Sequence, residues 1–155
     1  MKALSKEQLI QKLEAYCAYQ ERCLFEIQNK LALLNASEED TKFIIKHLSL
    51  NRFFDQQRYA LSFANGKLRI NKWGRSKIKA ALIQKYIDSK LISDSIFCLD
   101  ENEYFQILQH LAERKLIELS NEKNEWVKKQ KIYRFLTSRG FLLEEINHVF
   151  DKIKS

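Results

Sequence analysis

The sequence predicts an all-α protein, on three observations. The 155 residues include no proline and only three glycines, so helix breakers and turn signals are scarce. Apolar residues recur at helical rather than alternating spacing through most of the chain. An isoleucine and a leucine four residues apart return twice further along. A β-sandwich or barrel would need many glycine- and proline-rich turns, which this sequence does not contain.

The composition is that of a folded chain, with 45% hydrophobic and 30% charged residues. Its length suffices for one ordinary core or for several small helical modules. No apolar run approaches the roughly 20 residues that cross a bilayer, so we expect no membrane segment. The three cysteines are odd in number and lack the spacing of a disulfide framework. We therefore expect a protein of the reducing cytoplasm.

The first part of the chain predicts three helices. Ser5 can cap a helix that begins near Lys6, with Gln8 as the reciprocal partner of a capping box. A second helix is expected over 21–33, and Ser37 can cap a third that runs to about Leu50. Their apolar stripes are Leu9, Leu13, Tyr16 and Cys17; then Leu24, Ile27, Leu31 and Leu34; then Phe43, Ile44, His47 and Leu48.

The middle of the chain predicts a helix from Gln56 to about Lys72, capped by Asp55. Gly66 falls on its expected core face, which suggests a closely approaching neighbour. Trp73-Gly74 interrupts the pattern, and a helix over 75–86 follows. The expected inward residues are Tyr59, Phe63, Gly66 and Ile70 in the first of these helices, and Ile78 and Leu82 in the second.

The last part predicts a short helical turn from Asp94 to Leu99 and then a helix capped by Asp100. A helix over 125–138 follows, and Gly140 suits a left-handed C-terminal stop. A final helix over 143–154 closes the chain. The expected inward residues are Tyr104, Ile107, Leu108 and Leu111; then Trp126, Ile132 and Leu136; then Ile146, Val149 and Phe150.

The recurring pair predicts a repeat. Ile27 and Leu31 are followed by Ile78 and Leu82 after 51 residues, and by Ile132 and Leu136 after another 54. Each pair lies in the middle helix of three, which predicts tandem three-helix modules too small to bury their apolar faces alone. The expected modules are 1–53 with the N-terminal helix, 54–99 and 100–155. Coincidence is the alternative, since this pair is common on amphipathic helices.

The charge is concentrated in one segment. Residues 56–87 carry eight basic and no acidic side chains, and the whole chain has a net charge of +7. Such a field indicates an anionic partner, either nucleic acid or an acidic protein surface. A solvated helix face is the simpler alternative. The acidic stretch from Asp94 to Glu125 could also neutralise part of this charge internally.

Our candidates for binding a partner or DNA are all basic: Arg58, Lys67, Arg69, Lys72, Arg75, Lys77, Lys79 and Arg139. Tyr59 and Trp73 fit core or module-junction positions better than base-stacking ones. The cysteines and histidines lack metal-ligand spacing, and no phosphate loop or nucleophile elbow is present. We expect no catalytic residue, no metal and no cofactor, and therefore no enzyme.

Two segments, 51–82 and 135–150, resemble the signature regions of the bacterial RecX proteins. The first combines an aspartate-capped helix start, a basic helix and a Trp-Gly turn, and the second an Arg-Gly-Phe turn before an acidic helix start. The chain departs from the pattern at Gln56, at Asn51, at Leu142 and at Tyr86, where a glycine would be expected. The matching residues are Phe54, Asp55, Arg58, Tyr59, Ala60, Trp73, Gly74, Arg75, Ile78 and Leu82, and then Leu136, Arg139, Gly140, Phe141, Glu144, Glu145, Ile146 and Val149.

The resemblance implies a non-enzymatic regulator of the RecA recombinase in DNA repair and the SOS response. It implies binding to RecA and its DNA filament, inhibition of the ATPase and recombinase activities, and three three-helix repeats in an elongated, curved array. We expect a monomer. Two other hypotheses remain open: a helical module that binds DNA or RNA directly, and an adaptor of another complex.

Overall fold

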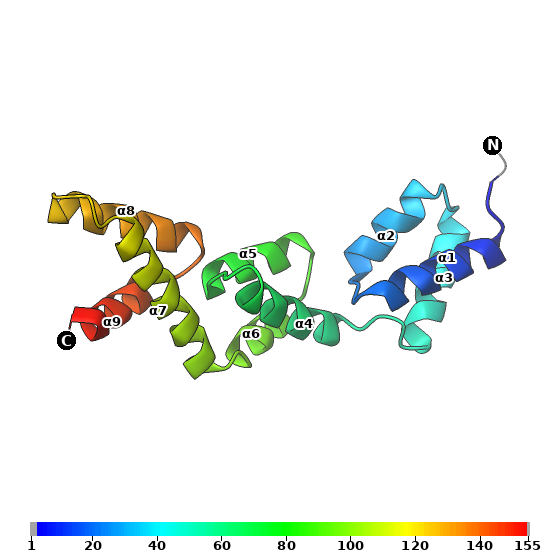
Figure 1. Ribbon diagram of the computed structural model, residues 1–155. Helices are drawn as coiled ribbons and strands as arrows, with labels where there is room; N and C mark the ends of the chain where they lie inside the picture. The colour runs from blue at the N-terminus through cyan, green and yellow to red at the C-terminus, as the bar shows by residue number, and fades with distance from the viewer. Residues whose placement is uncertain (1–2, 155) are drawn as a thin grey trace. The chain divides into compact units, whose positions relative to one another are not determined.

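The computed structural model describes residues 3–154, and these form helices and connecting turns without any strand (Figure 1). The all-α prediction is therefore confirmed. The nine helices of the described chain are α1 (Lys6–Tyr19), α2 (Leu24–Leu33), α3 (Glu38–Leu50), α4 (Gln56–Arg69), α5 (Arg75–Gln84), α6 (Ser89–Phe97), α7 (Glu101–Glu118), α8 (Glu125–Ser138) and α9 (Leu143–Lys154).

Helix starts predicted from capping residues are confirmed. Ser5 Oγ accepts from the Gln8 amide at 3.2 Å, and Gln8 Oε1 accepts from the Ser5 amide at 2.8 Å, which completes a capping box. Asp55 and Asp100 each accept an amide three residues later at 2.8 Å. These caps satisfy backbone donors that have no partner inside the helix.

Some boundaries differ from the prediction. α2 begins at Leu24, because Glu21 and Arg22 belong to the connection before its N-cap, Cys23. α6 begins at Ser89 and not at Asp94, so it is a nine-residue helix where only a turn was expected. The apolar residues before Asp94 form too short a pattern to predict that the helix begins at Ser89.

The chain divides into two compact units, and the division passes through the middle of the sequence. One unit holds residues 3–62 with Leu82–Ile92, and the other holds Phe63–Ala81 with 93–154. α4, α5 and α6 each contribute residues to both units. The expected module boundaries at 53/54 and 99/100 therefore remain a prediction.

The first unit has a core made by α1, α2 and α3, the three helices at the N-terminal end in Figure 1. Burying these aliphatic side chains supplies most of the favourable free energy of folding in so small a group of helices. Its buried members are Leu9, Leu13, Cys17, Ile27, Leu31, Ile44, Leu48 and Phe54.

The second unit has its core where α7 packs against α8 and α9 (Figure 1). Trp126, expected on the inward stripe of α8, is instead 69% exposed. It lies in the first turn of α8, six residues before Ile132, the first buried residue of that helix. The buried members of this core include Tyr104, Leu108, Ala112, Ile132, Leu136, Ile146 and Val149.

The predicted core face of α4 was only partly right, since Tyr59 is buried as expected but Ile70 is not. Ala60, Ala64 and Leu68 are almost fully buried, whereas Ile70 is 80% exposed. A Cβ added to Gly66 would meet no atom within 4 Å, so no neighbour approaches closely there. The packed face is formed by Tyr59, Ala60, Ala64 and Leu68, of which only Tyr59 was predicted.

The three middle helices end in the same way, which supports the repeat. The carbonyls of Leu31, Leu82 and Leu136 each accept a hydrogen bond from the amide five residues later, at 3.0, 3.3 and 3.2 Å. The residue before each donor has a positive φ, 59° for Asn35, 58° for Tyr86 and 98° for Gly140. Tyr86 therefore keeps the left-handed turn that its lack of a glycine had put in doubt.

Two glycines should respond oppositely to alanine. Gly66→Ala removes a flexible residue from inside α4, with free space for the methyl group, and should raise the free energy of unfolding by about 0.5–1 kcal/mol. Gly74→Ala would place a Cβ 2.4 Å from the Gly140 carbonyl oxygen and should lower it by about 1–3 kcal/mol. Urea unfolding followed by circular dichroism measures both. An equal effect of the two substitutions would contradict the packing described.

Candidate anion-binding surface

The start of α5 is held by residues far along the chain. The Gly74 amide donates to the Arg139 carbonyl at 2.7 Å, and the Ser76 amide donates to the Gly140 carbonyl at 3.0 Å. The Arg75 amide donates to the Tyr104 hydroxyl at 3.0 Å. Three amides that a helix start leaves without intrahelical partners are thereby satisfied. The turn after α8 can approach this closely because both Gly74 and Gly140 lack a side chain.

A buried carboxylate completes this junction. Glu145 is 5% exposed, and its Oε2 accepts from Arg75 Nη1 at 2.7 Å. Its Oε1 accepts from the Tyr104 hydroxyl at 2.8 Å and from the Leu142 amide at 2.9 Å. A buried charge is tolerated when it is paired and fully hydrogen-bonded in this way. Burial raises the pKa of the Tyr104 phenol, and the Glu145 carboxylate adds to that increase.

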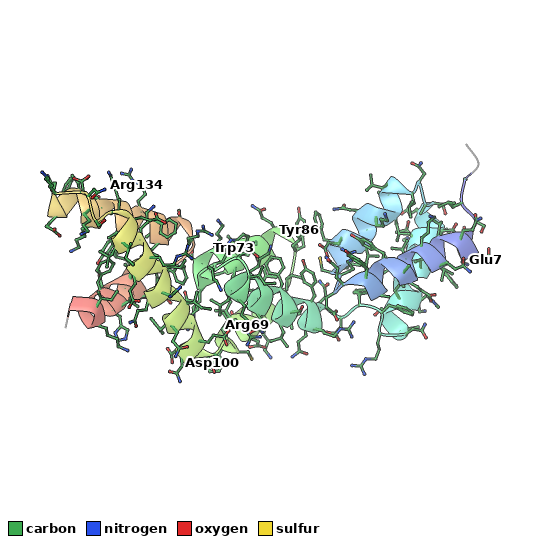
Figure 2. All side chains as sticks on the ribbon, in the orientation of Figure 1. Glu7, Arg69, Trp73, Tyr86, Asp100 and Arg134 are labelled. Carbon is green, nitrogen blue, oxygen red and sulfur yellow. The ribbon has the colours of Figure 1, made fainter. Side chains whose placement is uncertain are left out.

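Three of the eight candidate residues are committed to ion pairs within the chain. Arg58 Nε donates to both Glu21 oxygens at 2.9 and 2.8 Å, and its Nη2 reaches two carbonyls of the preceding loop. Arg69 Nε donates to Glu103 at 2.6 Å, and this pairing raises the pKa of the Arg69 guanidinium. Figure 2 places Arg69 toward Asp100 and apart from Trp73. Arg75 is bound to Glu145, as described above.

The acidic stretch therefore neutralises little of the basic segment. Of these partners, Glu103 alone lies between Asp94 and Glu125, whereas Glu21 and Glu145 lie outside it. The other basic residue of the segment, Lys85, pairs with Glu26 at 3.3 Å. The arginines of the segment are thus structural, and its unpaired charge is carried by lysines.

Four of the remaining candidates gather around the turn between α4 and α5. The ammonium groups of Lys67 and Lys77 each lie 4.8 Å from the centre of the Trp73 ring. Lys77 also reaches the Ser138 carbonyl at 3.5 Å, and Arg139 Nη1 donates to the Asn71 carbonyl at 3.1 Å. Lys72 is exposed within the same turn. We call Lys67, Lys72, Lys77 and Arg139 the cationic cluster, and none of them has a carboxylate partner among the described residues.

Lys79 is not part of this cluster. It is exposed, but two residues of an α-helix separate side chains by about 200°, so it points away from the side of α5 that carries Lys77. Arg58 belongs to the other compact unit. The structure thus brings together four of the eight predicted candidates.

The repeat shows why this cluster has unpaired charge. With the offsets of 51 and 54 residues, Lys77 corresponds to Glu26 and Arg139 corresponds to Lys85. Glu26 and Lys85 form an ion pair at 3.3 Å at the first of these positions. In the equivalent pair, Lys77 takes the place of the glutamate and Arg139 that of the lysine. Both members of this pair are therefore cations, and like charges repel unless an anion is present.

Comparison with known proteins gives the family. Residues 55–96 match the family described as "RecX, second three-helix domain", and residues 101–150 match "RecX, third three-helix domain". The fold and these matches define a protein of tandem three-helix domains. The chain belongs to the RecX family.

Curated relatives carry the name Regulatory protein RecX. The protein of Clostridium tetani (strain Massachusetts / E88) is 29% identical over 129 residues, which cover 83% of this chain and 59% of the relative. The protein of Yersinia enterocolitica is 31% identical over 108 residues, covering 70% and 62%. The chain therefore spans about three-fifths of the length of these relatives.

Two solved structures share the fold. The crystal structure of RecX from Lactobacillus salivarius aligns with a TM-score of 0.85 over 96% of each chain, at 23% sequence identity. A crystal structure titled as regulatory protein RecX aligns with a TM-score of 0.83, at 24% identity, over 94% of this chain and 71% of that one. At this identity the likeness establishes the fold of three-helix domains.

No helix within residues 3–154 is long and apolar enough to cross a membrane. The same residues contain no group of three histidine, cysteine or acidic side chains that could hold a metal ion.

Sequence reasoning missed the roles of Tyr104 and Glu145. Tyr104 was placed in a core stripe and Glu145 only matched a family motif, whereas both are polar parts of the junction. The usable signal was the position of Glu145, three residues after Leu142, which directly precedes the expected final helix; from there a glutamate can reach back to the amide at the helix start.

Removing the Tyr104 hydroxyl tests this junction. Tyr104→Phe leaves Glu145 without one donor and the Arg75 amide without its acceptor, so the free energy of unfolding should fall by about 1–3 kcal/mol. Tyr19→Phe, at a position 82% exposed, is the matched control and should change it little. Chemical denaturation measures both. A Tyr104→Phe protein as stable as the control would show that these hydrogen bonds contribute nothing net.

Proposed function

We propose that this protein regulates the RecA recombinase by binding RecA or the RecA–DNA filament and inhibiting its ATPase and recombinase activities in DNA repair and the SOS response. Membership of the RecX family supports a regulatory role, since the relatives are named regulatory proteins. RecA as the target comes from what the resemblance to that family implies. The protein acts without catalysis of its own, as a monomer in the cytoplasm, through three domains at 1–53, 54–99 and 100–155.

The observation that carries the proposal is the unpaired charge of the cationic cluster. Lys67 and Lys77 lie against the Trp73 ring, and Arg139 binds the Asn71 carbonyl two residues before it. None of the three is paired with a carboxylate among the described residues, whereas Arg69 and Arg75 are already paired. Surfaces of this kind steer an anionic partner and fix its orientation more than they add raw affinity. Both the phosphates of filament DNA and acidic patches of RecA are suitable partners.

Charge reversal tests this surface. The triple substitution of glutamate for Lys67, Lys72 and Lys77 avoids every ion-paired arginine, and it should raise the concentration that half-inhibits RecA's DNA-dependent ATPase by about tenfold or more. The matched control carries the same reversals at Lys12, Lys46 and Lys90, three exposed residues of the other compact unit. Equal inhibition by the two triple variants would remove the cluster from the mechanism. An unaltered protein that, at severalfold excess, leaves ATPase and strand exchange unchanged would overturn the regulatory proposal itself.

Direct binding to nucleic acid is the second candidate, and it is favoured because the cluster forms no ion pair with a carboxylate within residues 3–154. It requires tight binding to single-stranded DNA without RecA, and the triple variant should reduce the salt slope of that binding by about two to three. Fluorescence anisotropy across a salt titration measures the slope. Weak binding at physiological salt would argue for RecA as the principal partner.

A further inference from the structure

A second surface, at the start of α8, has exposed aromatic and cationic groups that the proposed function does not use. Trp126 is 69% exposed beside a pocket of about 260 Å³. Leu116, Ile132 and Phe150 provide its apolar lining. Lys128, Lys129 and one carboxylate, that of Glu125, also line it. An exposed tryptophan next to an apolar pocket has the composition of an interface hot spot.

The internal repeat shows what such a position does elsewhere in the chain. Offsets of 51 and 54 residues align Lys129 with Arg75 of α5 and with Leu24 of α2. The Leu24 amide donates to Gln56 Oε1 at 2.9 Å, and the Arg75 amide donates to the Tyr104 hydroxyl at 3.0 Å. In both cases a following part of the chain covers the start of the middle helix.

The start of α8 needs no such cover. α8 begins one turn earlier than the alignment with α5 requires, and Asn124 Oδ1 accepts from the Trp126 and Val127 amides at 3.0 and 3.2 Å. The extra turn caps itself and carries Trp126. At the equivalent positions of α2 and α5, another part of the chain covers the helix start. In α8 the first amides are satisfied by Asn124, so the corresponding surface is left open for another contact.

The charge of this surface defines its partner. Arg75 Nη1 meets the Glu145 carboxylate at 2.7 Å, whereas the ammonium of the equivalent Lys129 lies 5.5 Å from the Tyr133 ring and has no carboxylate among the described residues. Lys128 and Lys123 likewise have none there, while Lys131 is paired with Glu122 at 3.3 Å. A partner that supplied carboxylates would give Lys129 the ionic contact that Glu145 gives to Arg75.

We propose that the Trp126 surface is a docking site for an acidic segment of a partner protein, which inserts an apolar side chain beside Trp126 and places carboxylates against Lys128 and Lys129. The pocket favours a protein over nucleic acid, because an apolar side chain can fill a cavity lined by Leu116, Ile132 and Phe150, whereas a stacked base needs only the exposed face of an aromatic ring. This inference does not depend on RecA being the partner.

The test uses the full chain and a fluorescein-labelled peptide with one phenylalanine between two runs of glutamate. Fluorescence anisotropy should show saturable binding. Trp126→Ala and Lys129→Glu should each weaken it by about tenfold or more, as expected when a hot-spot residue is lost. Tyr19→Ala, at an aromatic residue that is 82% exposed, and Lys46→Glu are the matched controls and should bind as the unaltered chain does.

Three results would overturn the inference. A peptide with alanine in place of phenylalanine that binds equally well would show that the pocket takes no side chain. An oligothymidylate that binds more tightly than the peptide, and depends on Trp126, would identify a nucleic-acid surface. Self-association that Trp126→Ala abolishes, measured by light scattering, would show that a second copy occupies the site.

Discussion

The junction around the buried carboxylate of Glu145 organises the second unit. That one group joins the start of α5, the first turn of α7 and the start of α9 through three hydrogen bonds. Charges in a poorly solvated place are stable only when every lone pair finds a donor, so each partner fixes the position of the others. The cationic cluster depends on this arrangement, because Arg75 and Tyr104 set the start of the helix that carries Lys77.

The helical class and most helix starts could be predicted because they depend on local chemistry. Serine and aspartate caps act within four residues, and the repeat was visible in a single isoleucine–leucine pair. The core face of α4 could not be predicted by counting large side chains, since two alanines occupy it. Tyr86 adopts a left-handed conformation although it is not a glycine. The turn that recurs after each middle helix requires this conformation, whatever the intrinsic backbone preference of the residue at that position.

The candidate site could be predicted only as a segment. Its charge was plain in the sequence, but ion pairs between residues more than thirty positions apart decide which cations remain available. Sequence reasoning had no means to assign Glu21, Glu103 and Glu145 to particular arginines. The division that resulted, with paired arginines and unpaired lysines, follows the ability of a guanidinium to make several fixed hydrogen bonds.

Side chains from later parts of the chain cap the starts of α2 and α5, and this makes the folding of these helices cooperative with the folding of those later parts. The amides of Leu24 and Arg75, the first residues of these helices, donate to side chains from later parts of the chain, so each helix start is complete only while that part remains folded. The amides of Arg75 and Ser76 should therefore exchange with solvent deuterium when α7–α9 opens, even if α5 itself stays helical. The self-capped α8 makes no such demand, because Asn124 satisfies its first amides from within the same segment.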